Sequence, residues 1–139
     1  MPALELIAEH QPDIPVCLFM SSIPAATAAI AHRLLVKGKR YIPLMNSPFV
    51  PLVAVLWPVE KAKDFLLWSE TCSRITRADD GNAGRWMRQT KQPFLVTLPS
   101  LVEHNDWVPS VKGGRQHVPG REKWRHALYL AENALDYNW

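Results

Sequence analysis

A chain of 139 residues fits a single domain, 1–139, and its 47% hydrophobic content is enough for a packed core, which excludes an intrinsically disordered protein. The formal charge of +3 is mild and argues against nucleic acid as a partner. Cys17 and Cys72 are too few and too far apart for a disulfide framework or a zinc site. Cys17 lies in an apolar run and is predicted to be a reduced core residue, as in an intracellular protein.

The N-terminus carries Glu5, Glu9 and Asp13, where a secretory signal would have a basic start followed by an apolar run. Proline or charge interrupts every apolar stretch before the length of about 18 residues that a membrane helix needs, so no membrane span is expected. We therefore expect a cytoplasmic protein.

Helical patterns alternate along the chain with short apolar runs. Ser22 and Pro24 supply an N-cap and an early proline for the second helix, which ends in Lys37 and the C-terminal glycine Gly38. Pro58 begins a later helix. Apolar periodicity and these end signals predict helices over 2–10, 25–37, 58–70, 79–90 and 122–135.

Three apolar runs have the length and the flanking turn residues of buried strands. They are PVCLFM at 15–20, LVAVLW at 52–57 and FLVTL at 94–98, and a shorter extended segment is expected at 40–44. Because strands alternate with helices in this order, the sequence predicts a three-layer α/β domain with the three runs as its core strands.

The stretch 79–112 carries the residues best suited to a site. It begins with the paired carboxylates Asp79 and Asp80 at a helix start, continues through the third core strand, and ends in a polar loop. Ligands of α/β sheets usually bind where such loops gather, at the carboxyl ends of strands. The polar and aromatic candidates after the strand are Ser100, His104, Trp107, Ser110, Lys112 and Arg115.

Several segments resemble a known family: WPVEKAKDFLLW, ADDGNAGRW, QPFLVTLPSLVEHNDWVPSVKGG and the closing ENALDYNW. They look like the C-terminal half of a nucleotide-sugar glycosyltransferase-like family of actinobacteria and their phages, related to the A-type glycosyltransferases. The resemblance extends from about Pro15 onward, and PSLVEH with SVKGG after it is its most specific part.

The resemblance implies roles for these candidates. Asp79 or Asp80 would be the general base that accepts the proton of the acceptor hydroxyl. His104 would help to bind Mn²⁺ or Mg²⁺ together with a nucleotide pyrophosphate. The substrate-binding residues would be Ser100, Trp107, Ser110, Lys112 and Arg115, with Trp107 stacking on a sugar and the two cations binding the diphosphate.

Each role has a simpler alternative. The two aspartates are also explained as an N-cap and a dipole-favoured acid, and His104 as a hydrogen-bonded loop residue. Lys112 and Arg115 also fit a solvated basic loop. Among the six tryptophans, Trp57, Trp68 and Trp86 are better explained as core residues than as sugar-binding residues.

In such enzymes the first half supplies a nucleotide-binding unit and a strand ending in Asp-x-Asp, and nothing before Asp79 fits that pattern. We therefore expect a partial transferase fold without its N-terminal donor-binding strands, acting as the acceptor-side half of a transferase and inactive as an isolated chain. A companion chain with the donor half, or a second copy, is the expected partner, and a nucleotide sugar the expected ligand. The alternative is a non-catalytic binding or structural module that reuses the fold and is phage-encoded, in which case it would lie in the host cytoplasm.

Overall fold

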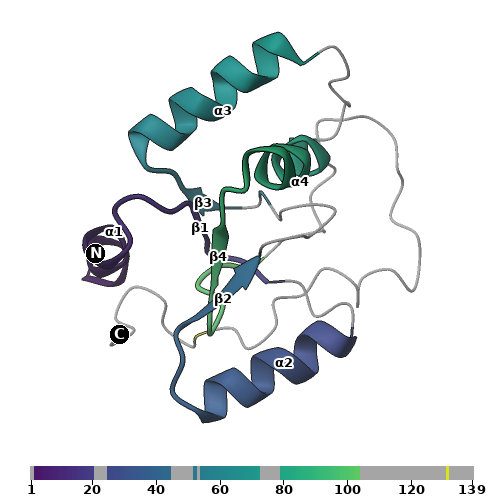
Figure 1. Ribbon diagram of the computed structural model, residues 1–139. Coiled ribbons are helices and arrows are strands. Elements are labelled where there is room, and N and C mark those ends of the chain that lie inside the picture. Colours follow the sequence, from purple (N-terminus) through teal and green to yellow (C-terminus); the bar gives the residue numbers. More distant parts are fainter. Residues whose placement is uncertain are drawn as a thin grey trace.

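Four helices and a four-stranded mixed sheet make up the described part of the chain (Figure 1). The structure is a computed structural model, and it describes residues 2–20, 25–44, 52, 54–72, 79–103 and 131. In chain order the elements are α1 (Pro2–His10), β1 (Val16–Cys17), α2 (Ala25–Val36), β2 (Tyr41–Leu44), β3 (Val55–Leu56), α3 (Val59–Thr71), α4 (Asp79–Thr90) and β4 (Phe94–Thr97). The predicted α/β class is confirmed, while the helix predicted at 122–135 lies outside the described residues.

The sheet has the strand order β2-β4-β1-β3. Its two central strands, β1 and β4, are parallel, with Val16 opposite Leu95, and each is flanked by an antiparallel outer strand. All three predicted core runs contain a strand, but β1 and β3 have only two residues each. The expectation that 52–57 is a fully buried strand was wrong in one respect: β3 is an outer strand and is half-buried, because only β1 pairs with it.

Alternate side chains of the strands separate the core into two layers, one on each face of the sheet. Cys17 and Val96 pack with side chains of α2, α3 and α4, whereas Val16 and Leu95 pack with side chains of α1. In Figure 1, α1 stands to the left of the strands and α4 to their right. The helices therefore cover both faces of the sheet, as the three-layer prediction requires.

An aromatic cluster attaches α3 to the rest of the domain. None of the α3 side chains is fully buried, so this helix depends on a few large contacts. The cluster consists of Trp57, Phe65, Trp68, Trp86 and Phe94, whose neighbouring ring centroids lie 5.2–5.9 Å apart. Trp86 is 1% exposed, and Trp57 and Trp68 are half-buried against the core, which confirms that these tryptophans are structural. Aromatic pairs in such geometries add about 0.5–1.5 kcal/mol each to the energy of burial.

The ends of α2 and α4 determine where the chain turns back. Gly38 has φ 67°, its amide donates to the Leu35 carbonyl, and the Lys39 amide donates to the Leu34 carbonyl, a Schellman motif that confirms the predicted C-terminal glycine. After α4, Lys91 adopts φ 56° and the Gln92 amide donates to the Met87 carbonyl. Only residues 91–93 then separate α4 from β4, so the helix and the strand run in opposite directions.

Within the described residues, no helix has both the length and the apolar character needed to cross a membrane.

Candidate functional site

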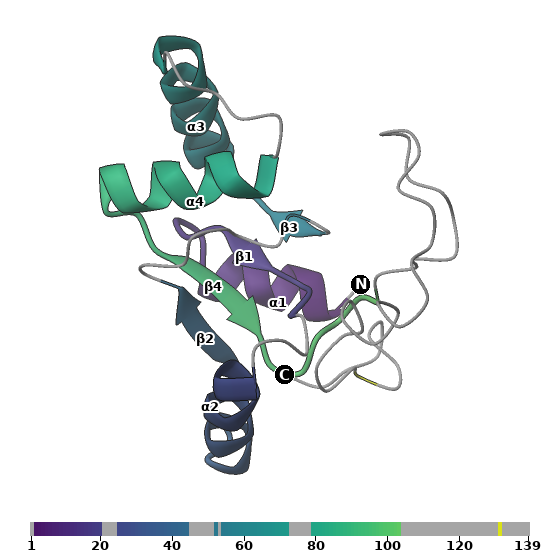
Figure 2. The ribbon, with the colours of Figure 1, turned by 90° about the vertical axis from the view of Figure 1, so that its right-hand side faces the viewer.

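The parallel pairing of β1 and β4 brings their carboxyl ends to the same edge of the sheet. Because α4 runs back along β4, its first residues, Asp79 and Asp80, lie at this edge. Figure 2 shows α4 lying over β4, with the start of the helix toward the end at which the β4 arrow points. The start of α4, the end of β1 and the end of β4 thus lie together, and we call this region the carboxyl edge.

A second observation places Asp80 near the end of β1. Burial raises the pKa of the Cys17 thiol, the last residue of β1, to about 12, and the negative charge of Asp80 adds to the shift. Cys17 is fully buried and its thiol is free, as predicted for a reduced core residue. The thiol therefore stays protonated at neutral pH, and among the side chains that the structure describes, the start of α4 contributes the exposed carboxylate of Asp80.

Ser100 connects the two chain segments that leave the central strands. Its side chain is fully buried, and its Oγ accepts a hydrogen bond of 3.0 Å from the Met20 amide. Its carbonyl accepts a bond of 2.9 Å from the Ala131 amide, and the Leu101 amide donates to the Leu18 carbonyl at 2.8 Å. Ser100 therefore positions the carboxyl edge, and the prediction that it also contacts a substrate stays a prediction.

Two buried polar side chains at this end of the domain were not singled out from the sequence. Asn82, in the first turn of α4, is 6% exposed, and Thr97, the last residue of β4, is fully buried. No described residue forms a hydrogen bond with the Oγ1 of Thr97. The sequence could have indicated Asn82, because it is an amide between small residues at a helix start. Thr97 lies inside an apolar run that ends in Leu98, and no pattern in that run distinguishes it from a core residue.

The cation on α4 that follows the aspartates most closely is Arg85. It is half-buried, and its Nη1 donates to the Cys72 Sγ at 3.5 Å, which connects α4 to the end of α3. Arg88, one turn further, is exposed. Arg85 therefore makes a contact between α4 and the end of α3.

Most of the predicted ligand-binding residues lie outside the described residues, as does the side chain of Asp79. These are His104, Trp107, Ser110, Lys112 and Arg115. Within 2–20, 25–44, 54–72 and 79–103, no three His, Cys, Asp or Glu side chains group closely enough to bind a metal ion. Asp80 is an oxygen ligand of the kind that Mg²⁺ and Mn²⁺ prefer, but one carboxylate does not constitute a site for either ion.

Comparison of the chain with models of protein families, with curated proteins and with solved structures finds no match.

Proposed function

We propose that this chain is the acceptor-side half of a nucleotide-sugar-dependent glycosyltransferase and that it works with a second chain that supplies the donor-binding half. The proposal rests on the resemblance of PSLVEH, SVKGG and the accompanying segments to the A-type-related transferase family. The structural observation that supports it best is Asp80, an exposed carboxylate at the start of α4, beside the carboxyl edge of two parallel strands.

Asp80 has the chemistry of the base in glycosyl transfer. An acceptor hydroxyl oxygen attacks the anomeric carbon of the donor sugar while a carboxylate accepts the hydroxyl proton. The bond between the anomeric carbon and the diphosphate oxygen breaks, and the diphosphate leaves with its electron pair. An acceptor bound against the start of α4 would present its hydroxyl to Asp80, and Asp79 is the other carboxylate at this helix start.

Two features of the described residues support a companion chain. The outer strands β2 and β3 each pair with a single neighbour, and natural proteins usually cover or blunt such edges. The outward side of α3 also exposes Val59, Leu66 and Leu67, which are 59–68% accessible. Exposed aliphatic side chains on one helix side suit a protein contact. We therefore expect the chain to be oligomeric or to copurify with a partner.

Calorimetry with manganese and common sugar nucleotides tests the division into two halves. We expect the isolated chain to bind them weakly or not at all, because residues 1–78 contain no strand-like run that ends in Asp-x-Asp. Adding a companion protein that carries a strand ending in Asp-x-Asp should produce binding and turnover. Tight manganese-dependent binding by the chain alone, abolished by His104→Ala, would show that the donor half is not missing.

The role of Asp80 is tested in that reconstituted pair. Asp80→Asn should lower kcat by about 100-fold or more and change KM little, as expected for loss of a general base. Asp64→Asn, which makes the same chemical change at an exposed position on α3, is the matched control and should leave kcat unchanged. If Asp79→Asn lowers kcat and Asp80→Asn does not, the base is Asp79.

A non-catalytic interaction module is the second candidate, and the exposed aliphatic residues of α3 favour it. An interaction module should self-associate or form a stable complex with a partner, and that complex should bind no sugar nucleotide. Light scattering together with calorimetry separates the two functions, because only the transferase binds a sugar nucleotide once the complex has formed.

A further inference from the structure

The first half of the chain contains a long interval without negative charge. Between Asp13 and Glu60 there is no aspartate or glutamate. Every lysine and arginine of this interval lies within eight consecutive residues, as Arg33, Lys37, Lys39 and Arg40. These residues belong to the second half of α2 and to the turn that leads into β2. A region of one charge sign therefore stands out in a chain whose overall charge is mild.

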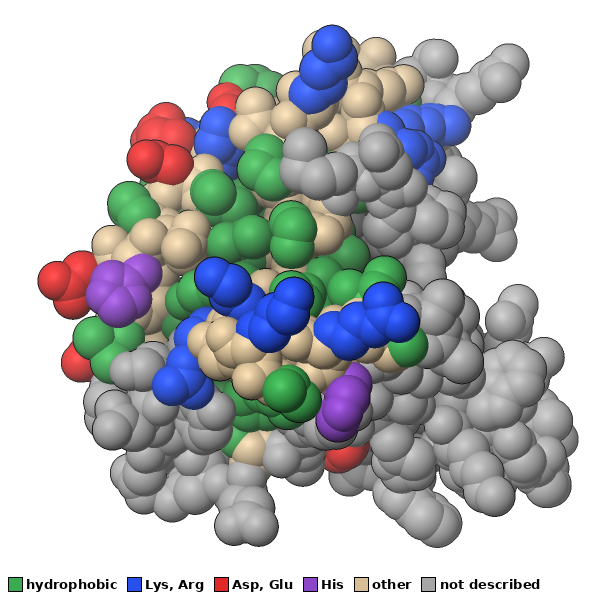
Figure 3. Space-filling model, turned by 60° about the horizontal axis from the view of Figure 1, so that its bottom comes forward, with side chains coloured by type: hydrophobic (Ala, Val, Ile, Leu, Met, Phe, Trp, Pro, Cys, Tyr) green, Lys and Arg blue, Asp and Glu red, His purple; other side chains and the backbone are tan. Residues whose placement is uncertain are grey.

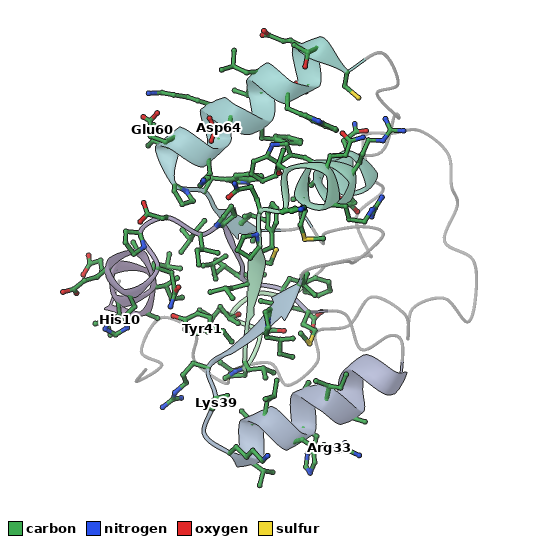
Figure 4. All side chains as sticks on the ribbon, viewed as in Figure 1. His10, Arg33, Lys39, Tyr41, Glu60 and Asp64 are labelled. Carbon is green, nitrogen blue, oxygen red and sulfur yellow. The ribbon has the colours of Figure 1, made fainter. Side chains whose placement is uncertain are left out.

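Three of these cations are exposed on α2 and the turn that follows it, on the side that faces away from the sheet. Ala31, Leu34 and Leu35 pack toward the core, whereas Arg33 and Lys37 are exposed, and Lys39 is exposed after the Schellman turn. Figure 3 shows blue Lys and Arg side chains gathered on the face that comes forward there, with green hydrophobic side chains among them, and Figure 4 labels Arg33 and Lys39 at that end of the molecule.

Two aliphatic side chains accompany these cations. Val36 is 74% exposed and Ile30 is 51% exposed. At 100° per residue, Val36 lies beside Arg33 on the exposed side of the helix, and Ile30 lies beside Lys37. Cations in the last turn are expected at any helix C-terminus, because they complement the helix dipole. That explanation does not account for two accessible aliphatic residues on the same side.

We propose that this face, formed by Ile30, Arg33, Val36, Lys37 and Lys39, docks on the surface of an anionic lipid bilayer. Lysine and arginine near such a surface are attracted by acidic headgroups, and aliphatic side chains enter the boundary between headgroups and acyl chains. Nucleic acid would satisfy the cations but would gain little from Ile30 and Val36, so the mixture of the two residue types favours a bilayer. The complementary charge identifies the occupant as a membrane rich in acidic phospholipid.

This inference does not depend on the transferase proposal. The face contains none of the residues of the carboxyl edge. It is also separate from the exposed aliphatic side chains of α3, because α2 and α3 lie at opposite ends of the molecule in Figures 1 and 2. It also requires no membrane-spanning helix, since the contact is made by one exposed helix side.

Sedimentation of the full chain with vesicles is the test. Vesicles of phosphatidylcholine mixed with phosphatidylglycerol should bind the protein, and vesicles of phosphatidylcholine alone should not. Each cation near an acidic surface strengthens binding by about fivefold, so Arg33→Glu with Lys37→Glu should weaken it by at least about 25-fold. Raising the salt concentration should weaken it too, because the surface charges are screened.

Matched variants distinguish a bilayer from other anions. Lys63→Glu on α3, where the native side chain is 59% exposed, changes the net charge as much as either reversal on α2 and should leave vesicle binding unchanged. Val36→Ser keeps every charge and should weaken binding to anionic vesicles by several-fold while leaving any binding to duplex DNA unaffected. Equal binding to both kinds of vesicle, no binding at low salt, equal loss with Lys63→Glu, or tighter binding to DNA than to anionic vesicles would each overturn the proposal.

Discussion

Replacing Ser100 by alanine tests how the carboxyl edge is assembled. The substitution removes the acceptor of the buried 3.0 Å bond from the Met20 amide. Because both residues are buried, water cannot easily replace the lost oxygen, and an unsatisfied buried amide costs about 1–3 kcal/mol. We expect the free energy of unfolding to fall by about 2 kcal/mol. For a chain of this length that corresponds to a decrease in Tm of roughly 6 °C.

Urea unfolding followed by tryptophan fluorescence measures the loss directly, because Trp86 is buried in the core. Ser69→Ala is the matched control: its Oγ donates to the Leu66 carbonyl within α3 at 2.6 Å, at an exposed position where water replaces the bond. The control should change stability by less than about 0.5 kcal/mol. If Ser100→Ala also changes the free energy of unfolding by less than about 0.5 kcal/mol, the view that this hydroxyl fixes the two segments to each other is refuted.

Three further predictions concern single groups of the domain. The pKa of Cys17 is about 12 in the folded chain against an ordinary value of 9.0, so the buried protonated thiol contributes its full stability below pH 9, and this contribution is lost as pH rises toward 12. Urea unfolding between pH 9 and pH 12 should show the free energy of unfolding of the wild type falling by up to about 1.4 kcal/mol per pH unit more than that of Cys17→Ala. An equal dependence of the free energy of unfolding on pH in the two proteins would contradict this. Thr97→Val should raise the free energy of unfolding by about 1 kcal/mol, because the buried Oγ1 has no hydrogen-bond partner among the described residues. A lower thermal midpoint would show that the hydroxyl is needed. Gly38→Ala should cost about 1 kcal/mol in the same assay, since φ 67° is unfavourable for alanine while an added Cβ would contact nothing within 4 Å, and Gly38→Asn should cost less.

Local signals were enough to determine the four described helices. The predicted segments 2–10 and 79–90 coincide with α1 and α4, and the glycine signal at Gly38 ends α2 within one residue of the prediction. Helix periodicity, caps and C-terminal glycines act between residues a few positions apart, so the sequence displays them directly. The paired aspartates could be assigned to a helix start for the same reason.

Pairing across the chain was decided only by the tertiary structure. The runs at 15–20 and 52–57 contain strands of two residues, because the number of residues that pair depends on partners distant in sequence. Ser100 appeared to be a loop residue available to a substrate, yet its hydroxyl bonds an amide 80 positions away. Asp80 became a residue of the carboxyl edge because β1 and β4 pair in parallel and α4 runs back along β4. Contacts of this kind depend on which distant segments bury each other's apolar faces, a property of the whole fold that no local pattern encodes.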